Sequence, residues 1–231
     1  MTQSSWTATL LATRAPAVAV PSGWYVVSQG RSSAVVGPHT RFDGGVHQGK
    51  EAKAVFSRCR FIENRVTVTV YGGGALRLKQ DCAPTFTDCH FIRNNGGAEG
   101  GGIWLTGLSA ATFRGCVVTD NIAYVEGGGI YVEQQAHPTF ADMLVNDNVA
   151  DSGAGITLAG SCKPTFTNVT VDGNVATDYG GGIESRLEAR PVFTGLVVSP
   201  AMSMVSPTLM IPVSTRPSSK QTVTWSTARG L

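Results

Sequence analysis

Residues 91–130 read FIRNNGGAEGGGIWLTGLSAATFRGCVVTDNIAYVEGGGI, and this stretch decides the fold because it contains one full unit of an internal repeat. Its landmarks are Asn94, a glycine triplet at 100–102, Phe113 and Asn121, after which a second triplet begins at Gly127. The two triplets are 27 residues apart, and so are the two Asn residues. A fixed spacing of about 20 to 50 residues is typical of solenoids and repeat arrays.

The same landmarks recur on both sides of this stretch. Triplets of Gly, or of Gly with one Ala, stand at 73–75, 100–102, 127–129, 153–155 and 180–182, after a shorter copy at 44–45. A Phe follows each of these six sites by 11 residues, at Phe56, Phe86, Phe113, Phe140, Phe166 and Phe193. An Asn follows the first five of these Phe residues by eight positions, at Asn64, Asn94, Asn121, Asn148 and Asn174. The constant phase predicts about six copies of one structural unit.

The pattern inside a unit predicts short strands. Each triplet is followed by alternation such as Ile130-Tyr131-Val132-Glu133, which indicates a strand with one buried face. A second strand contains the Phe, and a third, such as 89–92, ends near the Asn, which leaves no room for a helix. Such a unit buries its inner face only by stacking on copies of itself. Since parallel crossovers are right-handed, we predict an all-β, right-handed parallel β-helix of about six coils of about 27 residues.

Stacking turns equivalent residues into columns. One inward column holds Val46, Leu76, Ile103, Ile130, Ile156 and Ile183, and the six Phe residues form another. We expect the five Asn residues to form a ladder in which side-chain amides bond along the axis and satisfy buried polar groups at the corner. The triplets are expected at corners that need positive φ or close backbone approach.

Composition divides the chain into three parts. All 16 acidic residues lie between Asp43 and Glu188, together with only 11 of the 18 Lys and Arg residues, so the repeat region is acidic although the chain has a formal net charge of +2. We predict a β-helix over 44–198, an N-terminal cap or irregular first coil over 1–43, and a Ser/Thr/Pro-rich, disordered tail over 199–231. Basic residues do not cluster within the repeats, so no nucleic-acid partner is expected.

The repeats resemble a known family. The pairs FIEN (61–64) with GGAL (73–76), FIRN (91–94) with GGGI (100–103), and VTDN (118–121) with GGGI (127–130) are similar to the FxxN and GGA[ILV] repeats of chlamydial polymorphic membrane proteins. More broadly they resemble the right-handed β-helices of the pectate-lyase-like superfamily. The resemblance implies the fold and a place outside the cell or on its surface, although no export signal is evident. It does not imply one activity, because that superfamily includes lyases, hydrolases, adhesins and autotransporter passengers.

The five Cys residues cannot all be paired. Cys59, Cys89 and Cys116 occupy one repeat position that Met143, Val169 and Leu196 fill in later units, which indicates an inward apolar slot. We expect a ladder of free thiols there, although the stacking also allows a bridge between Cys59 and Cys89.

One candidate binding surface follows from the outward positions after each triplet. These form a column of His47, Arg77, Trp104, Tyr131, Thr157 and Glu184, beside a second column of Gly49, Lys79, Thr106, Glu133, Ala159 and Arg186. Aromatic rings on adjacent coils stack on sugar rings while polar groups bind hydroxyls, so Arg77, Trp104, Tyr131, Thr157 and Glu184 form a candidate glycan face. Alternatively, Trp104 and Tyr131 are strand-forming residues that pair across coils and bind nothing.

Acidic residues supply the only metal candidates. Glu99 and Glu126 precede consecutive triplets and are expected to stack, which is unfavourable unless solvent, a base or a cation separates them. With Asp120, Asp147 and Asp151 they are candidates for a calcium site, the alternative being a solvated acidic edge. No other metal site or cofactor is predicted.

These observations favour a non-catalytic, surface or secreted β-solenoid that is adhesin-like or structural. The alternative is a β-helix that binds or degrades polysaccharide, as a lyase or glycoside hydrolase. No catalytic residues are predicted, because four of the five Asn-to-triplet connections differ by at most one residue and leave no long loops to wall a groove. A polysaccharide or cell-surface glycan is the expected partner. The chain is expected to be peripheral to a membrane at most, and a monomer or part of a longer array.

Overall fold

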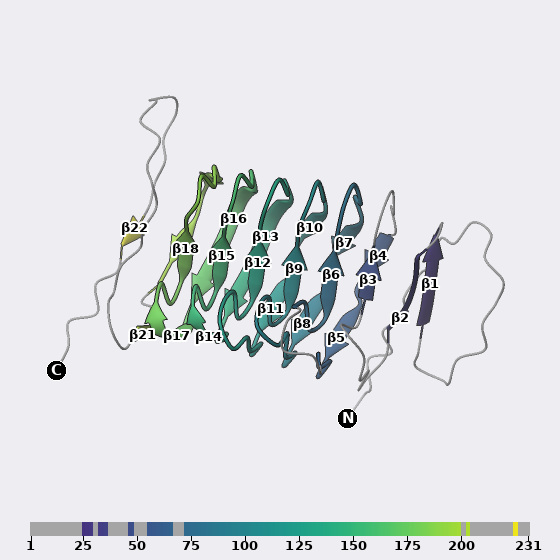
Figure 1. The fold of residues 1–231 in the computed structure, drawn as a ribbon, viewed down its shortest axis with the longest axis horizontal. Coiled ribbons are helices and arrows are strands. Elements are labelled where there is room, and N and C mark those ends of the chain that lie inside the picture. Colours follow the sequence, from purple (N-terminus) through teal and green to yellow (C-terminus); the bar gives the residue numbers. More distant parts are fainter. Residues whose placement is uncertain are drawn as a thin grey trace.

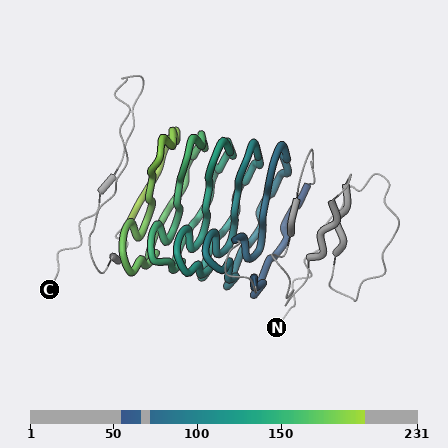
Figure 2. The backbone as a smooth tube through the Cα atoms, viewed as in Figure 1, coloured from purple at the N-terminus to yellow at the C-terminus, as the bar shows by residue number. Residues whose placement is uncertain are grey.

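The fold was analysed in a computed structural model, which describes residues 25–29, 32–36, 46–48, 55–66, 72–199, 202–203 and 224–225. Within these residues every regular element is a strand. The coils follow one another along the long axis of the molecule, so that equivalent strands lie side by side (Figures 1 and 2). No helix suited to crossing a membrane occurs in the described part of the chain.

The strands that follow the glycine triplets form one parallel sheet, here called the triplet sheet. In spatial order it contains β3 (Val46–Gln48), β6 (Leu76–Leu78), β9 (Ile103–Leu105), β12 (Ile130–Val132), β15 (Ile156–Leu158) and β18 (Ile183–Ser185). Each strand pairs with the equivalent strand of the next coil, so that Leu76, Ile103 and Ile130 are direct neighbours. The predicted column of inward aliphatic residues is therefore in register.

The remaining strands of each coil contain the Phe and the residues up to the Asn. They form a second parallel sheet, here called the Phe sheet, with strands β4 (Val55–Ser57), β5 (Arg60–Ile62), β7 (Thr85–Thr87), β8 (His90–Ile92), β10 (Thr112–Arg114), β11 (Val117–Thr119), β13 (Thr139–Asn146), β16 (Thr165–Asp172), β19 (Val192–Thr194) and β20 (Val197–Val198). In two coils the two short strands run on as one, β13 and β16, and in the next coil they are separate again as β19 and β20. A smaller parallel sheet of β14 (Val149–Ser152), β17 (Val175–Tyr179) and β21 (Met202–Ser203) follows the Asn corner. This arrangement confirms the predicted all-β parallel solenoid.

The terminal segments contribute three further strands. β1 (Tyr25–Gln29) and β2 (Ser32–Val36) pair with each other in antiparallel fashion. Near the other end of the chain, β22 (Thr224–Trp225) pairs with β20. Most residues of the predicted cap at 1–43 and of the predicted tail at 199–231 lie outside the described residues.

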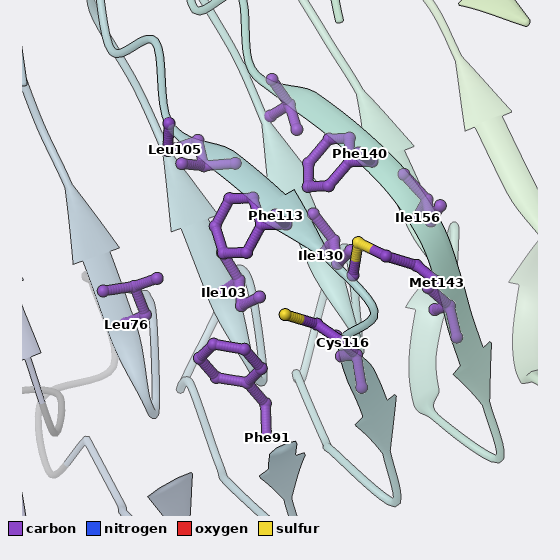
Figure 3. Close-up of a cluster of buried hydrophobic side chains, with 14 of the residues drawn as sticks. Leu76, Phe91, Ile103, Leu105, Phe113, Cys116, Ile130, Phe140, Met143 and Ile156 are labelled. Carbon is purple, nitrogen blue, oxygen red and sulfur yellow. The ribbon is translucent and has the colours of Figure 1, made fainter. Parts of the chain in front are cut away.

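The core is a narrow apolar space between the two main sheets, in which side chains from equivalent positions are stacked (Figure 3). The rings of Phe86 and Phe113 are parallel with centroids 4.8 Å apart, and those of Phe113 and Phe140 follow at 5.2 Å. Phe56, Phe166 and Phe193 extend this stack at both ends. Offset stacking adds roughly 0.5 to 1.5 kcal/mol for each pair beyond the burial of the ring.

Five Asn side chains form a ladder at one corner. The amide of Asn121 donates to Oδ1 of Asn148 at 2.9 Å and to the carbonyl of Phe91 at 2.9 Å. Its own Oδ1 accepts from Nδ2 of Asn94 at 2.8 Å, and the same pattern links Asn64 to Asn94 and Asn148 to Asn174. All five are at most 1% exposed, so the ladder satisfies backbone groups that water cannot reach.

Residues other than Gly occupy left-handed backbone conformations at two further corners. The bend between the two strands of the Phe sheet has positive φ in every described coil, at Arg58, Asp88, Gly115, Asp142, Asn168 and Gly195. The residue before each Asn of the ladder also has a positive φ, at Glu63, Arg93, Asp120, Asp147 and Gly173. Where Gly occupies the bend, the preceding coil fills the space: a Cβ on Gly115 would lie 2.5 Å from Oδ1 of Asp88.

The cysteines are free thiols. Sγ of Cys89 lies 3.6 Å from the carbonyl of Phe56, in the preceding coil, and that of Cys116 lies 3.6 Å from the carbonyl of Phe86. Cys116 and Met143 point into the same part of the core (Figure 3). Burial raises the pKa of Cys82 and of Cys162 to about 11, as expected for thiols in an apolar core.

Candidate functional site

The outer face of the triplet sheet carries the residues of the predicted glycan face. Strand register places Trp104 between Arg77 and Tyr131, and Thr157 and Glu184 continue the column on the next two coils. The second column lies directly beside it: Lys79, Thr106, Glu133, Ala159 and Arg186 each follow the last residue of a triplet-sheet strand. Ala159 packs against Trp104 and Tyr131, so the second column shares this outer face.

The two aromatic rings are covered rather than open. Trp104 is 7% exposed and Tyr131 is 4% exposed, and with Ala159 they form an apolar cluster separate from the main core. An open aromatic platform, which the glycan hypothesis requires in its simplest form, is therefore absent in this conformation. The Phe sheet differs, because its outward positions alternate with buried ones and carry mainly Thr and Val.

Charged side chains provide part of the cover over Trp104. The guanidinium carbon of Arg77 lies 4.1 Å from the centroid of the ring, and Nζ of Lys79 lies 5.6 Å from it. The indole Nε1–H donates to Oε1 of Glu133 at 3.2 Å. These contacts leave Trp104 with cation–π partners on its face and a carboxylate at its edge.

Glu99 and Glu126 belong to this same face. Glu99 forms a parallel β-bridge with Glu126, and Glu126 forms one with Ser152. Each of these three residues immediately precedes a triplet. The first Gly of each triplet then turns the chain close against the outer column: Gly100 has φ of 57°, and a Cβ there would lie 2.9 Å from Cβ of Trp104. Only Gly fits this approach, and it positions the preceding Glu at the edge of the face.

Arg186 links the acidic side chains. It forms an ion pair with Glu126 and lies 3.9 Å from Oε1 of Glu184. Glu126 is only 12% exposed in its side chain and Glu184 is 18% exposed, so water screens these charges poorly. The structure therefore brings together two groups that the sequence presented separately, the aromatic column and the Glu99–Glu126 pair.

Burial and neighbouring charges shift the pKa values of this face. Burial, Glu133 and Glu126 raise the pKa of Glu99, against the opposing effects of Arg186 and Arg77. Burial likewise raises the pKa of Glu184, although Arg186 opposes it. Burial, together with the nearby Glu126, Glu99 and Glu133, raises the pKa of Tyr131. Burial is thus the main reason why ionising these groups is unfavourable.

Two buried oxygens on this face have no hydrogen-bond partner. They are Oγ1 of Thr106, a residue 7% exposed, and Oε2 of Glu184. Unpaired buried polar atoms are uncommon, and each costs roughly 1 to 3 kcal/mol. The repeat predicts the second column, with Thr106, Glu133 and Arg186. It does not predict that side chains of this column lie over the aromatic rings.

The acidic residues do not form a metal site in the described part of the chain, where no three His, Cys, Asp or Glu side chains are arranged to hold an ion. Asp147 lies beside Asn146, and Asp151 accepts a hydrogen bond from Thr177 at 2.6 Å. Neither contact connects these residues to Glu99 or Glu126.

A family model described as the right-handed β-helix region matches residues 42–190. The chain belongs to this right-handed β-helix family. The matched range contains the whole triplet sheet and all residues of the outer face described above. Comparisons with curated proteins and with solved structures gave no significant match.

Proposed function

We propose that this β-helix is a non-catalytic protein, secreted or held at the cell surface, that binds an extended glycan along the outer face of its triplet sheet in the manner of an adhesin. One observation supports the proposal above others. The triplet sheet combines an apolar aromatic floor, formed by Trp104, Tyr131 and Ala159, with hydrogen-bonding groups grouped over it.

The chemistry of sugars suits such a surface. A sugar ring has apolar C–H faces that pack on aromatic groups and hydroxyls that bind charged and polar side chains. Arg77 and Lys79 are long and flexible, so a ligand can displace them from Trp104 without rearranging the sheet. Neighbouring coils are about 4.8 Å apart, so an extended polymer lying along the axis meets the next residue of the column at each step.

Binding to immobilised glycans tests this proposal. We expect wild-type protein to bind at least one polysaccharide, and we expect Arg77→Ala and Glu133→Ala to weaken that binding. Thr85→Ala and Thr165→Ala, on the outer side of the Phe sheet, are matched controls that should bind normally. Absence of any glycan binding by folded wild-type protein would contradict the proposal, and so would normal binding by the Arg77 and Glu133 variants.

A second candidate is polysaccharide hydrolysis. It is favoured by the register of Glu99 and Glu126 on neighbouring coils, where the pKa of Glu99 is raised and Arg186 forms an ion pair with Glu126. Glycosidases use two carboxyl groups, one as the general acid and the other as base or nucleophile. Release of reducing ends from a bound polysaccharide, lost in Glu126→Gln, would favour hydrolysis over binding alone.

A further inference from the structure

We propose that the glycan held on this face is a cationic amino-sugar polymer, whose ammonium groups are bound by Glu99, Glu126 and Glu184. The inference rests on the proposed glycan-binding function and adds the substrate class. It follows from the charges of the face, where carboxyl groups outnumber bases, and from two of its buried oxygens.

Carboxyl groups outnumber bases on this face. At one end the cations Arg77 and Lys79 lie over Trp104, whose indole N–H donates to Glu133. At the other end Glu126 and Glu184 lie beside Arg186, and Glu126 also forms a bridge with Glu99 on the coil of Trp104. Among the described residues of the face, four carboxyl groups therefore meet three bases, and this excess favours a positive ligand.

The carboxyl groups are not balanced by Arg186 alone. Its guanidinium pairs with Glu126, while Glu184 is at 3.9 Å from its other terminal nitrogen, beyond hydrogen-bond range. The pKa values of Glu99 and Glu184 are raised, so ionising either group on this half-buried surface is unfavourable. A ligand ammonium would make ionisation of these groups favourable, because an opposite charge within about 4 to 6 Å favours the ionised form.

Two unpaired oxygens indicate hydroxyl and ammonium partners. Oε2 of Glu184 is buried and can only accept a hydrogen bond when ionised, which an ammonium or hydroxyl of the ligand would donate. Oγ1 of Thr106 is buried beside Trp104 at the other end and is likewise without a partner. A sugar hydroxyl can both donate to it and accept from it.

Other ligands fit these features less well. An acidic polysaccharide would bring carboxylates against Glu99, Glu126 and Glu184, where like charges repel. A neutral polysaccharide would leave the excess of carboxyl groups on this face without a cationic partner. A lysine-rich peptide would satisfy the charge but offers neither the flat apolar ring faces that suit the Trp104–Tyr131 floor nor the hydroxyls that suit Thr106.

Titration calorimetry with four oligomers tests the inference: a glucosamine hexamer, its N-acetylated counterpart, a galacturonate hexamer and a lysine hexamer. We expect the glucosamine hexamer to bind most tightly. Glu99→Gln and Glu184→Gln should each weaken its binding about fivefold, in line with a modest ion pair, and should weaken binding of the N-acetylated hexamer less. Glu63→Gln, whose ion pair with Arg93 lies at the corner of the Asn ladder, is the matched control and should bind as wild type does.

The outcomes separate this inference from the function on which it rests. Equal or tighter binding of the N-acetylated or galacturonate hexamer would overturn the amino-sugar inference and leave glycan binding intact. Equal binding of the lysine hexamer would show that charge alone is recognised and would also overturn it. If no saccharide binds, the proposed function itself fails. Far-UV circular dichroism of both Gln variants, which keep the shape of Glu, verifies that each is folded.

Discussion

Replacing Asn121 by Ala tests how much of the stability of this β-helix depends on the corner ladder. In the native structure Oδ1 of Asn121 accepts from the backbone N–H of Asn94 at 2.9 Å and from its Nδ2 at 2.8 Å. Its own Nδ2 donates to the carbonyl of Phe91 and to Oδ1 of Asn148, both at 2.9 Å. The variant loses all four bonds at a residue with no exposed surface.

The magnitude follows from what each partner retains. Nδ2 of Asn94 still donates to the carbonyl of Phe61, and Oδ1 of Asn148 still accepts from the backbone N–H of Asn121. The backbone N–H of Asn94 loses its acceptor inside the protein, which costs roughly 1 to 3 kcal/mol, and the other three bonds contribute about 1 kcal/mol each. We therefore expect the free energy of unfolding to fall by about 4 to 6 kcal/mol, a large part of the roughly 5 to 15 kcal/mol of a typical domain.

Urea denaturation followed by far-UV circular dichroism measures this loss. Asn121→Asp keeps one acceptor but places a second carboxylate oxygen against the carbonyl of Phe91, so we expect it to be at least as destabilising as Asn121→Ala. Asn146→Ala, two residues before Asn148 on the next coil, is the matched control and should cost less than about 1 kcal/mol. The reasoning is refuted if Asn121→Ala costs no more than Asn146→Ala, or if Asn121→Asp is the milder change.

Four further results are expected. Phe113→Ala should lower the free energy of unfolding by about 4 kcal/mol in urea denaturation, because the ring is fully buried between two others. Phe193→Ala, at the partly buried end of the stack, should cost clearly less. Equal costs would contradict the stacked core. Gly101→Ala should destabilise the fold by about 2 kcal/mol or more in the same assay, because its Cβ would lie 2.2 Å from the carbonyl oxygen of Gly128 in the next coil. A thiol reagent applied to native protein should modify Cys59 before the four fully buried thiols, as peptide mass mapping would show; rapid labelling of the others would argue against the core. The pKa of Glu99 is raised in the folded state, so its stabilising contribution is present below the usual pKa of Glu and is lost as pH rises through the raised value. Glu99→Gln should therefore be more stable than wild type at pH 7 and not at pH 4.

Much of the fold could be predicted because the same pattern of inward and outward residues recurs in six copies of the repeat. The positions of Phe113 and Ile130 recur with one phase, and a parallel stack requires every unit to place the same side of each strand inward. The bend at Asp88 and Asp142 could not be predicted in this way. Its left-handed conformation is adopted by Arg, Asp, Asn and Gly in different coils, so no single residue type marks the position.

The candidate site was only partly predictable. The column containing Trp104 and Tyr131 follows from strand alternation, but alternation says nothing about how far a side chain is covered. Trp104 is buried because Arg77 lies over its ring and Glu133 binds its edge, and both contacts depend on side-chain conformation across coils. Likewise, the turn at Gly100 directs Glu99 toward the same face, a consequence of backbone geometry rather than of spacing.

The sequence by itself determined the periodic part of this protein: the period and order of the coils, the inward columns and the Asn corner. It could do so because each of these features depends on nearest-neighbour stacking that repeats from unit to unit. Only the tertiary structure decided which outward groups meet. Arg186 reaches Glu126 although the two are 60 residues apart in the chain, because stacking converts that separation into a distance of two coils. The charge pattern of the outer face arises at that level, and the proposed ligand follows from it.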